Sequence, residues 1–217
     1  MESSAQSGYY NIIFVLGPPG SGKGTLCKLT TNRLNTSGHS YRHLSVGDYL
    51  RQLCETGVPC EDESFDFDKI RNHLRESKLL PADVLIPVLE HKIGSILDGN
   101  GTAITWLVDG FPRNIETTLA FEEKIGKPVK VVVLECTHDT AQRRFLNRSR
   151  EKSDDEKRFE KRYGEYVENM QAIREHYKSN IETICVDGTS EEYLGKFISA
   201  LPPITTDTKS KDNEGIA

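Results

Sequence analysis

The chain has 217 residues, with 28 Lys and Arg against 33 Asp and Glu, so its formal net charge is −5. This length suits a single domain, or one core with small insertions. The mild acidity is unfavourable for bulk nucleic-acid binding, and we expect no nucleic-acid partner. The five cysteines are scattered and form no Cys-x-x-Cys pair. This predicts reduced thiols and no zinc site, with a Cys54–Cys60 pair as the open alternative.

The first residues and the hydropathy of the chain predict neither a targeting peptide nor a membrane-spanning helix. The first eight residues have neither the basic nor the apolar character of a signal or transit peptide. No apolar run approaches the roughly 20 residues needed to span a bilayer. We expect one domain at 10–201, disordered tails at 1–9 and 202–217, and no membrane partner. The expected location is the cytoplasm, with the nucleus as the alternative.

Short apolar runs alternate with helical patterns along the chain. The expected strands are 10–16, 41–45, 103–108, 129–134 and 181–186. The expected helices are 26–34, 47–53, 67–76, 83–97, 115–125, 140–148, 159–177 and 191–201. Pro87 should lie in the first turn of its helix or kink it. Strands that alternate with helices predict an α/β fold with a parallel sheet and helices on both faces.

A glycine-rich segment, Gly17-Pro-Pro-Gly-Ser-Gly-Lys-Gly-Thr25, connects the first expected strand to the first expected helix. Glycines let backbone N–H groups turn inward around phosphate oxygens, and a helix N-terminus favours the same anion. Lys23 adds a charge that can reach the β- and γ-phosphates, so a phosphate loop is favoured over a plain turn. Gly24 departs from the generic pattern, in which a hydroxyl follows the lysine directly. The residues expected to contact ATP here are Gly20, Ser21, Gly22, Lys23, Gly24 and Thr25.

Polar segments also follow two other expected strands, at Asp109-Gly-Phe-Pro-Arg113 and at Asp187-Gly-Thr189. Because the carboxyl ends of parallel strands meet at one edge of a sheet, we expect these segments around one ligand site. Asp109, with Thr25, could hold Mg²⁺ through water, although a turn or cap aspartate is the alternative. The guanidinium forks of Arg51 and Arg113 suit phosphate, with a surface ion pair as the alternative for any single arginine.

The segment 143–162 is rich in Arg and Lys, interleaved with acidic residues at 154–156. A solvated, salt-bridged helix face would explain most of these charges. The sharper hypothesis is a mobile cationic lid that closes over a triphosphate, excludes water and supplies charge to the transferring group. Arg158 and Arg162 are four residues apart and therefore share one helix face. The six histidines show no useful pairing, and we expect ordinary surface or core positions for them.

Four segments together resemble the adenylate kinase and UMP–CMP kinase family: 17–25, Leu44-Ser-Val-Gly-Asp-Tyr-Leu-Arg51, Val108-Asp-Gly-Phe-Pro-Arg-Asn114 and 153–162. Their order and approximate spacing match over about residues 10–200, and Gly24 is usual in that family. The resemblance implies a P-loop three-layer fold with a five-stranded parallel sheet. It also implies an insertion at about 45–80 that binds a nucleoside monophosphate (NMP), and a short, zinc-free lid at about 148–160. The implied reaction is reversible transfer of the γ-phosphoryl group from Mg·ATP to an NMP.

The resemblance also assigns roles to individual residues. The transferring group would be stabilised by Lys23, Arg148 and Arg162, and the acceptor phosphate would be gripped by Arg51 and Arg113. Arg148 and Gly188 would complete the ATP site. The NMP site would consist of Ser45, Val46, Arg51, Leu80, Gly110, Arg113, Asn114 and Thr117. The implied ligands are ATP, an NMP and Mg²⁺, and we expect a monomer.

Some positions depart from the family pattern. The lid usually reads Gly-Arg-x-Asp-Asp-Asn but is Glu151-Lys152-Ser153-Asp154-Asp155-Glu156 here. Because lysine lacks the guanidinium fork, turnover could be reduced. Ser77 replaces a common glycine.

The acceptor base is the least determined feature. Val46 replaces the threonine typical of adenylate kinases, and Asn114 resembles the pyrimidine branch, but Thr117 replaces a base-reading asparagine of that branch. We therefore favour UMP or CMP as the acceptor. Adenylate kinase activity, or a nucleotide-binding regulatory protein with a decayed lid, are the alternatives.

Overall fold

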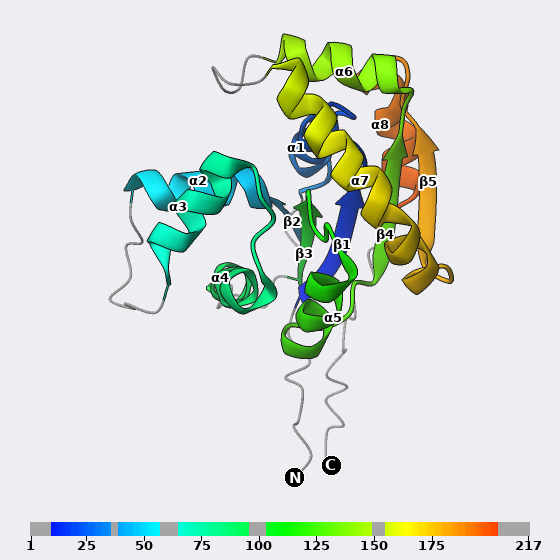
Figure 1. Cartoon of the computed structure of the whole chain (residues 1–217). Helices are drawn as coiled ribbons and strands as arrows, with labels where there is room; N and C mark the ends of the chain where they lie inside the picture. Colours follow the sequence, from blue (N-terminus) through cyan, green and yellow to red (C-terminus); the bar gives the residue numbers. More distant parts are fainter. Residues whose placement is uncertain (1–9, 36–38, 57–64, 96–102, 149–154, 204–217) are drawn as a thin grey trace, which may run out of the picture.

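The computed structural model describes residues 10–35, 39–56, 65–95, 103–148 and 155–203. Within these ranges, five strands form one parallel sheet in the order β2-β3-β1-β4-β5 (Figure 1). The strands are β1 (Tyr10–Leu16), β2 (His39–Ser45), β3 (Ala103–Asp109), β4 (Lys130–Glu135) and β5 (Ile181–Cys185). The helices are α1 (Lys23–Leu34), α2 (Val46–Thr56), α3 (Phe67–Glu76), α4 (Ala82–Gly94), α5 (Ile115–Lys124), α6 (His138–Asn147), α7 (Glu156–His176) and α8 (Ser190–Ser199). The predicted α/β fold with a five-stranded parallel sheet is confirmed.

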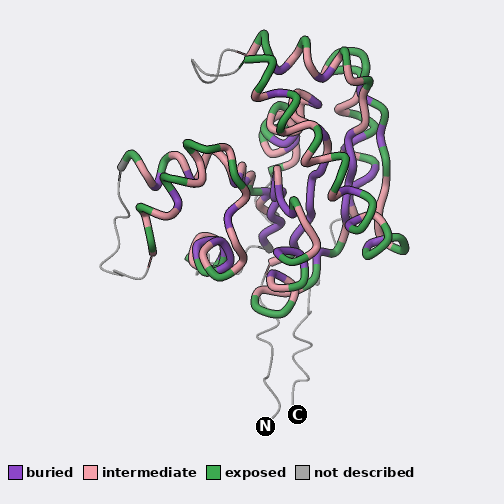
Figure 2. The backbone as a smooth tube through the Cα atoms, in the orientation of Figure 1, coloured by how far each residue is buried: buried purple, intermediate pink, exposed green. Residues whose placement is uncertain are grey.

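The central strand β1 explains why the sheet needs helices on both faces. Its alternate residues enter two different cores: Ile12 and Phe14 pack with helices α2 to α5 and α7, whereas Ile13 and Val15 pack with α1 and α8. Figure 2 shows these strands as the buried centre of the molecule. A strand that is buried on both faces is apolar throughout, which is why β1 reads as a continuous hydrophobic run.

Side-chain caps move two helix starts away from their predicted positions. The Thr137 side chain accepts a hydrogen bond from the Thr140 N–H, so α6 begins at His138 and not at Thr140. The Asp155 side chain accepts one from the Arg158 N–H, so α7 begins at Glu156 and not at Phe159. In α4, Pro87 is the sixth residue and lies beyond the first turn, so of the two expected alternatives the kink stays a prediction. The predicted end of that helix, at residues 96 and 97, lies outside the described residues.

The register of the sheet brings three strand ends together. Asp109, the last residue of β3, pairs with Val15 of β1 on one side and with Ser45 of β2 on the other. Helices α2 and α3, which lie within the predicted insertion at 45–80, stand together to one side of the sheet (Figure 1). The carboxyl edge of the sheet is therefore where the predicted site residues can meet. None of the described helices combines the length and the apolar character needed to cross a membrane.

Candidate active site

Two adjoining cavities, of about 500 Å³ and about 80 Å³, lie at the carboxyl edge of the sheet. Residues that line both are Gly47, Arg51, Leu79, Gly110, Arg113 and Arg162. The predicted site residues on the larger cavity are Gly20, Ser21, Gly22, Lys23, Gly24, Thr25, Ser45, Arg51, Asp109, Gly110, Arg113, Arg148, Arg162 and Gly188. The smaller cavity adds Val46, Leu80, Asn114 and Thr117. The structure therefore brings together the residues that the sequence pattern selected, while their individual roles stay predictions.

The loop between β1 and α1 has a backbone that only glycine adopts easily. Gly20 and Gly22 have φ angles of 86° and 88°, and a Cβ atom on Gly20 would lie 2.0 Å from the Ala141 carbonyl oxygen. Gly22 is the N-cap of α1 and offers no side-chain acceptor to the first N–H groups of the helix. These N–H groups and the positive end of the helix dipole face the larger cavity, which suits an anion.

Lys23 is held against the inside of this loop. Its Nζ donates hydrogen bonds to the Gly17 and Pro18 carbonyl oxygens, at 2.8 and 2.9 Å, and to Ser21 Oγ at 3.1 Å. Burial lowers the pKa of Lys23 to about 8, against the negative charge of Asp109 and with help from nearby arginines. A phosphate group in the loop would favour the charged ammonium of Lys23 and raise its pKa again.

Arg51 and Arg113 approach each other from different elements. A Cβ atom on Gly47 would lie 3.6 Å from one nitrogen of Arg51 and 3.8 Å from one of Arg113, so both guanidinium groups flank this glycine. Arg113 Nε donates to the Gly110 carbonyl oxygen at 3.0 Å, and Arg51 pairs with Asp48. Two forks that converge on one position can clamp a phosphate group, because each offers paired N–H donors.

Arg148 and Arg162 share an aromatic platform. Their guanidinium carbons lie 4.0 and 5.7 Å from the centre of the Phe145 ring, which is fully buried between α6 and α7. Burial, together with the positive charges of neighbouring arginines, lowers the pKa of Arg162 to about 9. Such crowding of like charges is relieved by a polyanion. The lid positions 149–154, including Lys152, lie outside the described residues.

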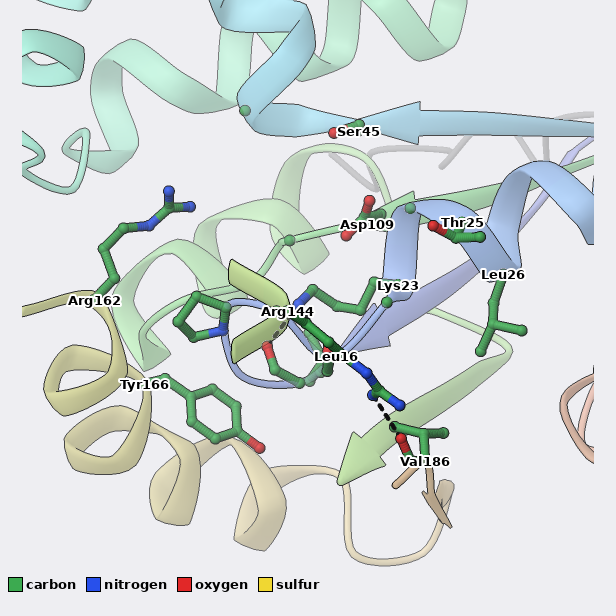
Figure 3. Close-up of a pocket in the computed structure, with 18 of the residues that line it drawn as sticks. Leu16, Lys23, Thr25, Leu26, Ser45, Asp109, Arg144, Arg162, Tyr166 and Val186 are labelled. Atoms are coloured by element: carbon green, nitrogen blue, oxygen red, sulfur yellow. Dashed lines mark hydrogen bonds between the residues drawn. The ribbon is translucent and has the colours of Figure 1, made fainter. Parts of the chain in front are cut away.

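Asp109 has an unexpected partner. His43 Nε2 lies 3.3 Å from Asp109 Oδ2, and the two side chains are only 10 % and 8 % exposed. The expectation that the histidines occupy ordinary positions is therefore wrong for His43. Figure 3 shows Asp109 between Ser45 and Lys23. Among the described residues, no group of three or more His, Cys, Asp or Glu side chains could hold a metal alone. Mg²⁺ fits such a site, because it is commonly held by one carboxylate, water and substrate phosphates.

The larger cavity is also lined by residues that had no predicted role, in addition to those named above. Arg144, part of the basic segment, donates to the Val186 carbonyl oxygen at 2.6 Å and also to that of Gly188 (Figure 3). It thereby fixes the loop after β5 to α6. Helix α7 contributes an inward row of residues to the larger cavity: Arg162, Glu165, Tyr166, Met170 and Ile173. Their spacing of three and four residues was readable in the sequence, but the same spacing describes ordinary core packing.

In the smaller cavity, the hydroxyl of Thr117 is used inside the protein. Thr117 is 3 % exposed, and its Oγ1 donates to Asn114 Oδ1 at 2.7 Å. The Thr117 N–H donates to the same oxygen at 2.9 Å, so Asn114 caps α5. The amide NH₂ group of Asn114 has no hydrogen-bond partner in the described part of the chain. Thr117 therefore orients Asn114, which can donate hydrogen bonds into the cavity.

Comparison with known proteins agrees with this geometry. The family model for adenylate kinase matches residues 15–182. The chain is 35 % identical to UMP-CMP kinase 3 of Oryza sativa subsp. japonica over 81 % of its length and 77 % of that protein. It is 34 % identical to UMP-CMP kinase 2 of Caenorhabditis elegans, over 79 % and 84 % of the two chains. It is 29 % identical to adenylate kinase 1 of Schistosoma mansoni, over 82 % and 85 %.

The fold and the site define a phosphate-loop phosphotransferase. More particularly, the chain belongs to the adenylate kinase family, whose matched relatives include both UMP-CMP kinases and adenylate kinases. It is therefore a nucleoside monophosphate kinase. Identities of 29–35 % to both kinds of relative leave the acceptor base to be argued from the smaller cavity.

Proposed function

We propose that this kinase transfers the γ-phosphoryl group of Mg·ATP reversibly to UMP or CMP. The larger cavity would hold the triphosphate on the loop at Gly20–Thr25, with Lys23 reaching the β- and γ-phosphates. The smaller cavity would hold the acceptor base, and Arg51 and Arg113 would grip the acceptor phosphate between the two. This arrangement is supported by the converging guanidinium groups at Gly47 and by the shared lining of the cavities.

Catalysis in this arrangement depends on positioning and charge. The acceptor phosphate is already an anion and needs no general base. Lys23, Arg148 and Arg162 would stabilise the charge that spreads over the oxygens of the transferring group. Asp109, Thr25 and water would hold Mg²⁺, which neutralises charge on the β- and γ-phosphates when it is bound. An arginine at this position can contribute roughly 10³–10⁵ in rate in phosphoryl transfer.

The preference for a pyrimidine rests on the lining of the smaller cavity. Val46 is 4 % exposed and offers no hydroxyl to an adenine, and its neighbours in the cavity include Leu50, Leu80 and Leu85. The Asn114 amide is a donor that matches the ring carbonyl of uracil or cytosine, which adenine lacks. The donor group of Asn114 is the observation that carries this preference.

A panel of AMP, UMP, CMP and GMP with ATP tests the acceptor. We expect kcat/KM for UMP or CMP to exceed that for AMP at least about tenfold, the scale of one buried hydrogen bond. The variant Val46→Thr should improve the use of AMP because it adds a hydroxyl to the cavity. A wild-type preference for AMP would contradict the assigned base. ATP binding without turnover on any acceptor would favour the regulatory alternative.

We infer the remaining properties from the same arrangement. We expect activity as a monomer. The ligands would be ATP and an NMP, without nucleic acid or membrane, and the expected location is the cytoplasm.

A further inference from the structure

One carboxylate in the larger cavity has no part in the reaction described above. Among the described residues that line this cavity, six are basic and two are acidic. The basic ones are Lys23, Arg51, Arg113, Arg144, Arg148 and Arg162. Asp109 is accounted for by Mg²⁺ and His43. The second acidic residue, Glu165, stands in a cavity that has to accept phosphate groups, which repel a carboxylate.

Glu165 faces this cavity from the middle of the inward row of α7. It follows Arg162 by one turn and precedes Tyr166, and these two neighbours project from α7 at the edge of the cavity (Figure 3). Its side chain is partly buried. Within the described part of the chain, the Glu165 carboxylate accepts no hydrogen bond and forms no ion pair. The carboxylate therefore does not fix α7 to a neighbouring element.

The charge of Glu165 acts on the arginine that would grip the acceptor. Burial lowers the pKa of Arg113, and the negative charge of Glu165 is the largest influence that opposes this shift. The Glu165 carboxylate and the Arg113 guanidinium group are farther apart than the partners of an ion pair. Glu165 therefore changes the electrostatic potential in the cavity but does not occupy the N–H donors of Arg113. The fork of Arg113 stays available to a ligand.

The charges of the cavity and of its ligands are close to balance with Glu165 present. Six basic and two acidic side chains leave a net charge of +4. Mg·ATP and an NMP each bring about two negative charges near neutral pH. Asp48, which pairs with Arg51, does not line the cavity, and its side chain is 39 % exposed, so water screens it. Without Glu165, the described lining would carry one positive charge more than these ligands neutralise.

We propose that Glu165 is a counter-charge that weakens the hold of the cavity on its phosphate ligands and so permits product release. Substrates and products of phosphoryl transfer carry the same total charge, and a cavity with six basic groups is at risk of retaining the products. Release of product limits the turnover of many enzymes. The inference rests on the proposed function for its effect on turnover, but its effect on anion affinity does not depend on the acceptor base.

The variant Glu165→Gln, measured by calorimetry in the full chain, tests this proposal. The matched control is Glu168→Gln, which makes the same change on the same helix at an exposed position outside both cavities. Tripolyphosphate is the first probe, because it binds without a base, and Mg·ATP is the second. We expect E165Q to bind both about three- to tenfold more tightly than wild type, from the loss of one charge a few ångströms away in a partly solvated site. E168Q should match wild type.

Turnover completes the test. With a saturating acceptor, E165Q should have a lower kcat, because product release is slower, and a KM for ATP that falls by a larger factor. The ratio kcat/KM should therefore rise, because the tighter binding extends equally to substrate and transition state. Unchanged affinity of E165Q for tripolyphosphate would overturn the proposal. Weaker binding would also overturn it, because the loss of a counter-charge cannot weaken the hold of the cavity on an anion. If wild type binds tripolyphosphate but does not phosphorylate UMP or CMP, the proposed acceptor fails while the affinity comparison still decides the role of Glu165.

Discussion

Binding of Mg·ATP should take up a proton above about pH 8, because of the position of Lys23. In the free protein, burial lowers the pKa of Lys23 to about 8 from an ordinary 10.5. Phosphate oxygens favour the charged ammonium, so the pKa in the complex should return towards its ordinary value. The affinity is therefore fully present below pH 8 and is lost progressively as the pH rises above it.

The size of the effect follows from the two pKa values. At pH 9, about nine in ten Lys23 side chains of the free protein are neutral, and each must gain a proton to bind the phosphates. The dissociation constant for Mg·ATP should therefore rise about tenfold between pH 7 and pH 9, which is about 1.4 kcal/mol. About half a proton should be taken up per ATP at pH 8.

Calorimetry in two buffers of different ionisation enthalpy measures both quantities. The variant Lys23→Met has no titrating group at this position and should bind Mg·ATP weakly. Its affinity should fall at most about twofold from pH 7 to 9, because Arg162, whose pKa is about 9, is about half neutral at pH 9. An affinity of the wild-type protein that stays constant over this range, or a release of protons on binding, would refute the reasoning about Lys23.

Three further substitutions follow from contacts in the structure. Ser77 has a φ of 51° and is the left-handed C-cap of α3, a conformation that glycine adopts more easily than serine. Ser77→Gly should therefore raise the free energy of unfolding, measured by urea denaturation, by about 0.5–1 kcal/mol. A lower urea midpoint would contradict this. Arg144→Met removes the hydrogen bonds to the loop after β5. The KM for ATP should rise about tenfold, while the KM for the acceptor should stay unchanged. An equal rise of both KM values would argue against a local effect. His43→Ala should raise the Mg²⁺ concentration needed for half-maximal activity several-fold, because Asp109 loses its partner; an unchanged magnesium titration would show that His43 does not orient Asp109.

The parts of the site that could be predicted from the sequence are those with a local signature. The loop from Gly17 to Thr25 is recognisable because strand, glycines, lysine and helix follow each other directly. Asp109 and Arg113 could be placed beside it because parallel strands end at a common edge. In both cases a short motif directly follows a regular strand, so the geometry of that strand determines where the motif lies.

The parts that could not be predicted depend on contacts between distant segments or on caps. His43 meets Asp109 only because β2 and β3 pair in one particular register, across 66 positions of the chain. Thr137 and Asp155 start their helices before the apolar pattern begins, since a cap needs only one side-chain oxygen. Glu165 lies on a helix face whose spacing equals that of core residues, so only the structure shows that this face borders a cavity.

The central claim is that this chain transfers a phosphoryl group from ATP to a second nucleotide, UMP or CMP. Analysis of the products tests this claim most directly. Purified protein is incubated with Mg·ATP, with and without UMP, and all nucleotides are quantified by chromatography. We predict that ADP and UDP appear together in equal amounts, and that ATP is stable when UMP is omitted. ADP formed without UDP, or ATP left unconsumed with UMP and with each of the other monophosphates, would contradict the account.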